Sequence, residues 1–141
     1  MLKRFGNQRG AALIETAITI PLVLLVSVSI FEFGRAYQTW QVLTNAAREG
    51  ARVAVLEQYT DAQVSDIVRN YLTGGRLTKA AAATITVVRN EPFGSTTASR
   101  ITVNYPFQFI VLNPVARLVQ TGSTMGTPLT MQSSALMRNE Q

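Results

Sequence analysis

The sequence predicts an α+β protein built on one long N-terminal helix. Three observations predict this fold: residues 11–31 form an apolar run with one formal charge, apolar residues then recur every three or four positions to about residue 56, and after Thr84 the period changes to two. The first pattern is typical of a membrane span, the second of an amphipathic helix and the third of strands. We therefore expect a transmembrane helix that continues into a small head, where a short helix packs on a three-stranded antiparallel sheet.

The apolar run is long enough to cross a membrane. As a helix rising about 1.5 Å per residue, it would span about 30 Å, the thickness of the hydrocarbon core of a bilayer. We assign residues 11–33 to the transmembrane helix. Pro21 lies inside it, where a proline is tolerated better than in a soluble helix. We expect either a bend at Pro21 that serves packing with neighbouring helices or an ordinary kink.

Glu15 is the one charge inside this run. A charge near the centre of a span costs about 2.5–3.5 kcal/mol on insertion scales, so such residues usually have a partner or a function. Glu15 lies four residues after Ala11 and hence on the same face of the helix. A cut between Gly10 and Ala11 would place a new ammonium group near that face. The alternative is that Glu15 reaches headgroup water and has no role.

The first ten residues set the orientation of the span. Lys3, Arg4 and Arg9 precede it and no acidic residue does, so we expect the N-terminus in the cytoplasm and residues 34–141 outside. We predict residues 1–10 as a leader. The chain would then be a single-pass protein of the inner (cytoplasmic) membrane.

The outer end of the span carries residues typical of a membrane interface. Glu32 ends the uncharged stretch, and Arg35 at i+3 is placed to form an ion pair with it. Tyr37 and Trp40 follow, with the amphipathic rings that favour the membrane–water boundary. We predict Glu32, Tyr37 and Trp40 at the membrane interface.

The helix is expected to continue to about Leu56 and to cover the head. Gly34 and Gly50 each weaken it by about 1 kcal/mol relative to Ala. The apolar stripe predicted to face the head consists of Phe33, Tyr37, Trp40, Leu43, Ala47, Ala51 and Ala54.

A second helix is predicted after Thr60. Thr60 and Gln63 form a capping-box pattern, an apolar face follows, and Gly74–Gly75 ends the helix. Val115–Val119 is predicted as one further helical turn within an irregular loop that includes Asn113–Pro114 and the Gly122–Gly126 region.

The three strands are predicted from alternating patterns. The first starts at Thr84, a turn-rich connection covers Asn90–Ser99, and the second strand covers Arg100–Phe109 with its odd-numbered apolar residues on one face. Pro106 cannot donate a ladder hydrogen bond, so this strand should lie at an edge or bend there. The third strand is expected over Leu129–Met137.

Composition argues against several functions. The chain has no His and no Cys, which removes disulfides, thiol chemistry and the commonest general base and metal ligand. It has no phosphate-binding or nucleophile motif. We expect no enzymatic activity, no metal and no cofactor.

The net charge of +5 does not indicate nucleic-acid binding. Three of the thirteen basic side chains belong to the leader, which leaves ten against eight acidic ones. Those ten are dispersed and form no patch interleaved with aromatic residues. We expect no nucleic-acid partner.

Two stretches of the sequence carry a family resemblance: RGAALIETAITIPLVLLVSVSIFEFGRAY and NAAREGARVAV. They resemble the TadE-like proteins of the Tad (Flp) pilus assembly system, most strongly over residues 9–56. Thr16 departs from the family, since many such pseudopilins have an aromatic residue after the Glu. The resemblance implies a pilin-like helix, cleavage by a prepilin peptidase after Gly10, and packing in which Glu15 and Pro21 fix the register of the subunit. The implied partners are other pilins and pseudopilins, the prepilin peptidase, the inner-membrane assembly platform and membrane lipid.

Two alternatives are open at this stage. Ser27–Val28–Ser29 has the small–x–small pattern of a signal-peptidase site, and cleavage there would release a soluble binding module beginning at Ile30. The predicted helix runs through this site, whereas signal peptidases need an extended chain. The other alternative is an uncleaved single-span protein of the cell envelope.

Overall fold

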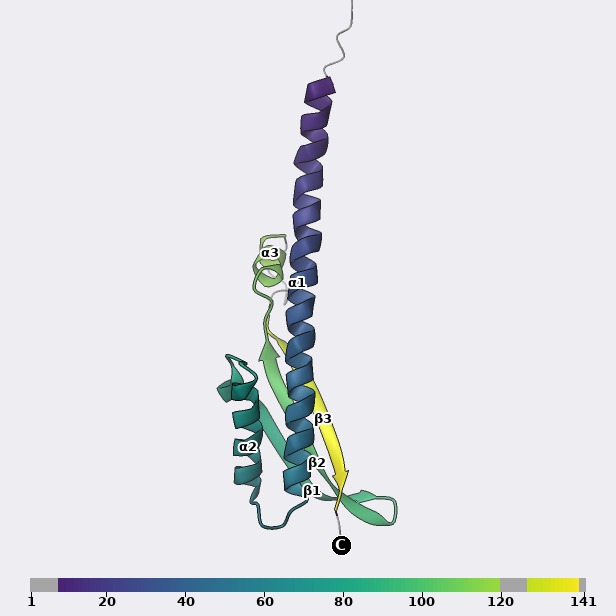
Figure 1. The fold of residues 1–141 in the computed structure, drawn as a ribbon, viewed down its shortest axis with the longest axis vertical. Helices are drawn as coiled ribbons and strands as arrows, with labels where there is room; N and C mark the ends of the chain where they lie inside the picture. Colours follow the sequence, from purple (N-terminus) through teal and green to yellow (C-terminus); the bar gives the residue numbers. More distant parts are fainter. Residues whose placement is uncertain (1–7, 120–126, 140–141) are drawn as a thin grey trace, which may run out of the picture.

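The computed structural model describes residues 8–119 and 127–139 and has the predicted α+β architecture, with one long helix that runs along a small head and projects far beyond it (Figure 1). The elements in chain order are α1 (Gln8–Ala54), α2 (Asp61–Gly74), the 3₁₀ helix η1 (Ala80–Ala82), β1 (Thr84–Phe93), β2 (Thr96–Phe107), α3 (Leu112–Val119) and β3 (Leu129–Arg138).

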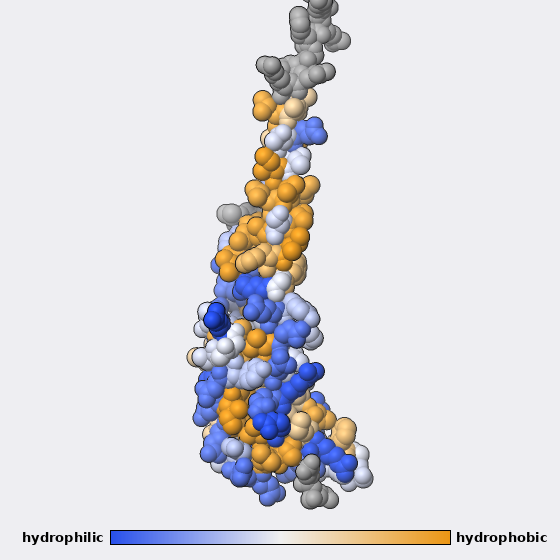
Figure 2. Space-filling model, in the orientation of Figure 1, coloured by the Kyte–Doolittle hydropathy of each residue, from blue (hydrophilic) through white to orange (hydrophobic). Residues whose placement is uncertain are grey.

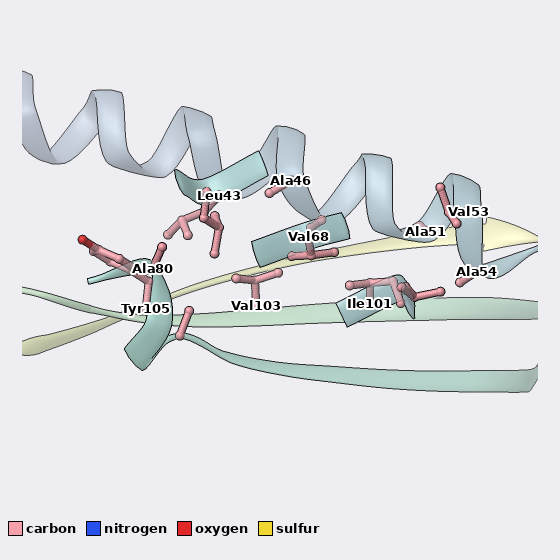
Figure 3. Packing of buried hydrophobic residues seen from close by; sticks show 14 of the residues in the cluster. Leu43, Ala46, Ala51, Val53, Ala54, Val68, Ala80, Ile101, Val103 and Tyr105 are labelled. Carbon is pink, nitrogen blue, oxygen red and sulfur yellow. The ribbon is translucent and has the colours of Figure 1, made fainter. Parts of the chain in front are cut away.

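The head is a layer of helices on one face of an antiparallel sheet. The strand order is β1-β2-β3, so consecutive strands are neighbours. In β2 the buried residues Ile101, Val103, Tyr105 and Phe107 alternate with partly exposed ones, as expected for a strand with one covered face. That face packs against the second half of α1 and against α2 (Figure 3). The opposite face is rich in polar side chains that are exposed or half-buried.

The two halves of α1 have different surroundings. Every residue from Ala11 to Ser27 is exposed, whereas the later half has a buried stripe against the head (Figures 1 and 2). The predicted stripe is confirmed at Leu43, Ala47, Ala51 and Ala54 and is wrong at its first three residues, because Phe33, Tyr37 and Trp40 are exposed. The buried stripe consists of Glu32, Ala36, Thr39, Leu43, Ala46, Ala47, Gly50, Ala51, Val53 and Ala54.

Small residues let α1 lie close to the head. Gly50 is buried at the crossing of α1 with α2 and β2, where an added Cβ would lie 2.5 Å from Val68 Cγ2 and 3.3 Å from Ile101 Cγ2. Gly50 is therefore required for this approach and is more than a weak point in the helix. Gly34, by contrast, has open space around the position of a Cβ.

Helix α2 is built as its sequence predicts. The side chain of Thr60 accepts a hydrogen bond from the backbone of Gln63, and the side chain of Gln63 accepts one from the backbone of Thr60, so two otherwise unpaired donors are satisfied. Val64, Val68 and Leu72 are fully buried. The predicted start and end of this helix are thus confirmed.

The predicted connection Asn90–Ser99 is wrong. Both strands extend into it, and the turn is only the two residues between Phe93 and Thr96, with Gly94 at a φ of +61°. A Gly readily adopts this left-handed conformation, which two-residue hairpin turns require. A bulge between Val88 and Glu91 interrupts the register.

Strand β2 is central, which corrects the prediction of an edge strand. The pairing of β1 with β2 ends at Thr84 and Asn104, whereas β3 pairs on to Phe107. Pro106 lies beyond the end of β1, so the central strand has only one neighbour there and tolerates a proline.

Asn113–Pro114 also differs from prediction, since both residues lie in the first turn of α3, where a proline does not interrupt the helical hydrogen bonds. The predicted Gly122–Gly126 loop lies outside the described residues.

Candidate functional site: the apolar helix and its junction with the head

The predicted processing site lies in the first turn of α1. Gly10 and Ala11 are helical, and Glu15 follows on the exposed surface of the same helix. None of the described side chains pairs with the Glu15 carboxylate. Lys3 and Arg4 lie outside the described residues, as does the side chain of Arg9. The structure therefore places Glu15 on a bare helix, without a cation from the head.

The hydroxyl groups in the apolar half of α1 are hydrogen-bonded within the helix. The hydroxyls of Thr16, Ser27 and Ser29 donate to the carbonyls of Ala12, Val23 and Leu25, at 2.7 to 2.8 Å. Such bonds one turn back satisfy a hydroxyl where no water is present. α1 remains helical through Pro21. It is also helical through Ser27–Ser29, where a signal peptidase would need an extended chain.

At the point where α1 meets the head, Glu32 forms a buried polar contact. Only 1% of Glu32 is exposed. Its Oε1 accepts hydrogen bonds from the backbone nitrogens of Ile110 and Val111, each at 2.7 Å. Its Oε2 accepts one from Arg35 Nη2 at 2.9 Å. Hydrogen bonds to a charged group contribute about 1.5–3 kcal/mol each, so this carboxylate ties the β2–α3 loop firmly to the helix.

Arg35 completes this contact. The nitrogen Nη2 that pairs with Glu32 also donates to the carbonyl oxygen of Gln108 at 2.6 Å. The guanidinium carbon lies 4.5 Å from the centre of the Phe107 ring, which is within the range of a cation–π interaction. Glu32 therefore accepts from two backbone N–H groups of the loop, and Arg35 donates to one of its carbonyl oxygens. The two opposite charges also neutralise each other.

Aromatic rings and a groove surround the junction. Phe109 packs edge to face against Phe107, with centroids 5.1 Å apart, and against Phe33, with centroids 5.8 Å apart. A groove of about 640 Å³ runs from Arg35 to Lys79. Lys79 Nζ donates to Gln108 Oε1, so a side chain that lines this groove also holds the loop that follows β2. We therefore regard the groove as part of the junction between α1 and the head.

Part of α1 matches a known protein-family model. Residues 10–52 match the model described as TadE-like protein. Over this segment the chain is similar to the TadE-like family. Comparison with curated proteins and with solved structures found no match.

The TadE-like segment corresponds to α1 almost from end to end. It includes the exposed apolar half, the Glu32–Arg35 pair and most of the buried stripe, and it ends two residues before α1 does. Within the described residues, α1 alone is long and apolar enough to cross a membrane, and none of its most apolar window is buried in the head. The helix is therefore consistent with membrane anchoring.

The junction was only half predicted. The Glu32–Arg35 ion pair is confirmed at 2.9 Å, but no partner for Glu32 in the head was predicted. Its loop partners follow it by 78 and 79 residues, and the apolar pair Ile110–Val111 carries no motif that marks its backbone as a donor. Tyr37 and Trp40 lie on the exposed side of α1 with ring centroids 6.2 Å apart. Their place at a membrane interface stays a prediction.

Proposed function

We propose that the chain is a minor pseudopilin, a structural and assembly subunit of a Tad (Flp) type IV pilus. The family match supports a protein associated with the Tad pilus. The observation that carries the finer proposal is the bare apolar half of α1, which projects from the head with Glu15 unpaired among the described residues (Figure 1). A free apolar helix of this length is unstable in water and needs lipid or other helices around it.

Cleavage after Gly10 would give Glu15 its counterion. The new ammonium group of Ala11 would lie one helical turn away, on the same chain or on a neighbour in the pilus. Because an unpaired charge is costly in an apolar environment, packing would favour the register that brings the two charges together. Glu15 would thus fix the axial position of the subunit, and Pro21 would allow the helix to adjust.

In this proposal the protein is inserted in the cytoplasmic membrane with its N-terminus inside and its head outside. Lys3, Arg4 and Arg9 hold the leader in the cytoplasm. Its partners are membrane lipid, the prepilin peptidase, the inner-membrane assembly platform and other pilins or pseudopilins. In this proposal the chain has no catalytic role and acts by packing against other pilus subunits.

N-terminal sequencing of the protein purified from its native host tests the proposal. We expect the mature chain to begin at Ala11. A start at Ile30 would favour the released binding module, and an intact leader would favour the uncleaved single-span protein. Gly10→Leu should retain the leader, whereas Ala17→Leu places the same side chain farther along the helix and should be processed normally. Normal processing of Gly10→Leu would contradict the proposed cut.

A second test separates insertion from assembly. Glu15→Gln should leave membrane insertion intact and reduce recovery of the subunit in sheared pilus fractions. Glu49→Gln, a carboxylate of the same helix that lies on the head, is the matched control and should assemble normally. Normal piliation by Glu15→Gln would rule out the role of Glu15 in register.

A further inference from the structure

The end of the head nearest the apolar half of α1 carries exposed aliphatic side chains. Ile110 is 64% exposed, Val111 41% and Val115 39%. We call Ile110, Val111 and Val115 the shoulder. In Figure 2 the hydrophobic colouring that predominates on the free helix extends to the top of the head, and a mixed surface with many hydrophilic residues lies below it.

The shoulder lies beside the last part of the predicted span. Together with Ser27, Val28 and Phe31 of α1, its residues Ile110 and Val111 line an apolar notch of about 280 Å³ around Glu32. Figure 1 shows α3, which follows this loop, alongside α1 and closer to its free end than the sheet is. A bilayer that reaches Phe31 therefore also reaches the shoulder, because the two are at the same height along the helix.

The backbone N–H groups of the shoulder are hydrogen-bonded within the protein, as a water-free environment requires. A loop that enters a bilayer must satisfy its N–H groups internally, because each unpaired group costs several kcal/mol there. Glu32 accepts from the backbone nitrogens of Ile110 and Val111, and Val111 accepts from the nitrogen of Val115 at 3.1 Å. The Glu32 charge is itself paired with Arg35. α3 also contains no acidic residue, so nothing in it opposes contact with an anionic membrane surface.

We propose that the shoulder inserts into the outer surface of the lipid bilayer and gives the head a second membrane contact beside the span. This inference rests on the membrane anchoring within the proposed function, and it is independent of processing and of pilus assembly. Two contacts fix the tilt of the head relative to the membrane, whereas a single helix would leave that tilt free to vary. The occupant of this surface is lipid, by its continuity with the exposed apolar surface of α1.

Site-directed fluorescence in the full chain tests the inference, and the absence of native cysteines makes single labelling possible. Ile110→Cys and Val115→Cys carry the probe on the shoulder. Val88→Cys is the matched control, because Val88 is 43% exposed and lies on the outer face of the sheet. Ile20→Cys reports on the span itself. Each labelled protein is reconstituted in phosphatidylcholine–phosphatidylglycerol vesicles that carry nitroxide quenchers at shallow or deep positions of the acyl chain.

We expect the shoulder probes to be quenched by the shallow nitroxide about twofold or more above the Val88 probe, as for side chains buried in the headgroup and upper acyl region. The Ile20 probe should be quenched best by the deep nitroxide. If the Ile20 probe is quenched and the shoulder probes behave like Val88, the shoulder is in water and this inference alone fails. If the Ile20 probe is not quenched either, membrane anchoring fails as well.

A dilution series distinguishes lipid from a second copy of the chain. Quenching of the shoulder probes should stay constant as the ratio of lipid to protein rises. A shielded environment that disappears on dilution would mean that the shoulder packs on another subunit, and this result would overturn the proposal.

Discussion

The carboxylate of Glu32 lies 2.7 Å from the backbone nitrogen of Val111, which follows it by 79 residues. This hydrogen bond joins the helix of the TadE-like segment to a loop that lies outside that segment. Since Ile110 donates to the same oxygen, one side chain holds the end of the head nearest the apolar half of α1. The junction thereby ties α1 to the loop that follows β2.

Glu32→Gln should destabilise the folded head by about 3 kcal/mol, the lower end of the range for removing one partner of a buried ion pair, because Arg35 is 30% exposed. The amide oxygen can still accept from the loop, but the amide nitrogen would face Arg35 donor to donor. Urea unfolding of the full chain in detergent, followed by Trp40 fluorescence, measures the loss. Glu49→Gln breaks a pair whose arginine is 62% exposed and should cost less than about 1 kcal/mol. Equal losses in both variants would contradict the role of Glu32.

The two glycines of α1 should respond to Ala in opposite directions. Gly50→Ala would push a Cβ against Val68 and Ile101, which are fully buried. Overpacking costs about 1–3 kcal/mol, whereas the higher helix propensity of Ala contributes about 1 kcal/mol. We therefore expect Gly50→Ala to lower the free energy of unfolding. Gly34→Ala meets no atom within 4 Å and should stabilise by up to about 1 kcal/mol. The same urea titration decides, and a gain in both variants would show that the head can move away from α1.

Arg89 should be irreplaceable by Lys. It donates to Asp61 Oδ1 at 2.6 Å and to the backbone carbonyls of Ala54 and Tyr59 at 2.7 and 2.6 Å. It therefore binds the end of α1, the connecting loop and the start of α2 at once, which only the forked guanidinium can do. We expect Arg89→Lys to lower the free energy of unfolding by about 2 kcal/mol through lost charge-assisted bonds. Arg52→Lys, in an exposed pair within one helix, is the control and should be nearly neutral.

The elements that the sequence predicted well are those with local causes. The α2 cap depends on Thr60 and Gln63 alone, and the buried face of β2 follows from alternation along one strand. The apolar half of α1 is likewise visible in the composition of a single segment. These features need no knowledge of the rest of the chain.

The elements that were missed depend on contacts between distant segments. The buried stripe of α1 includes Glu32 and small residues such as Ala46, because the helix must approach the sheet closely. Hydrophobicity alone would instead favour burial of Phe33 and Trp40. The hairpin Asn90–Ser99 looks like a loop by propensity, yet it is held in β pairing by its partner strands. The loop partners of Glu32, Ile110 and Val111, could not be predicted for the same reason.

The stability of the head should fall in acid partly through Glu91. Arg100 donates two hydrogen bonds to its carboxylate, at 2.6 and 2.9 Å, and thereby holds the pKa of Glu91 below its usual value. Because the folded state binds this proton less readily than the unfolded state, the contribution of the pair is complete above a pH of about 4.3 and is lost as the pH falls through the folded pKa. Thermal unfolding between pH 7 and pH 3 should show a smaller acid-induced drop for Glu91→Gln than for the natural chain. Glu57→Gln, an exposed carboxylate with no ion pair among the described residues, should keep the full drop.

The single tryptophan reports where the membrane ends. Trp40 follows Phe31 by nine residues, so it lies about 13 Å farther along the helix, whereas one headgroup layer is about 5–7 Å thick. If the hydrocarbon ends near Phe31, Trp40 therefore lies beyond the headgroup layer, in water. Lipids brominated deep in the acyl chain should then quench its fluorescence only weakly, although its ring is 47% exposed. Ile20→Trp in a Trp40→Phe background should be quenched strongly by the same lipids. Strong deep quenching of Trp40 itself would place the membrane boundary beyond the junction, and Glu32 would then lie within the hydrocarbon.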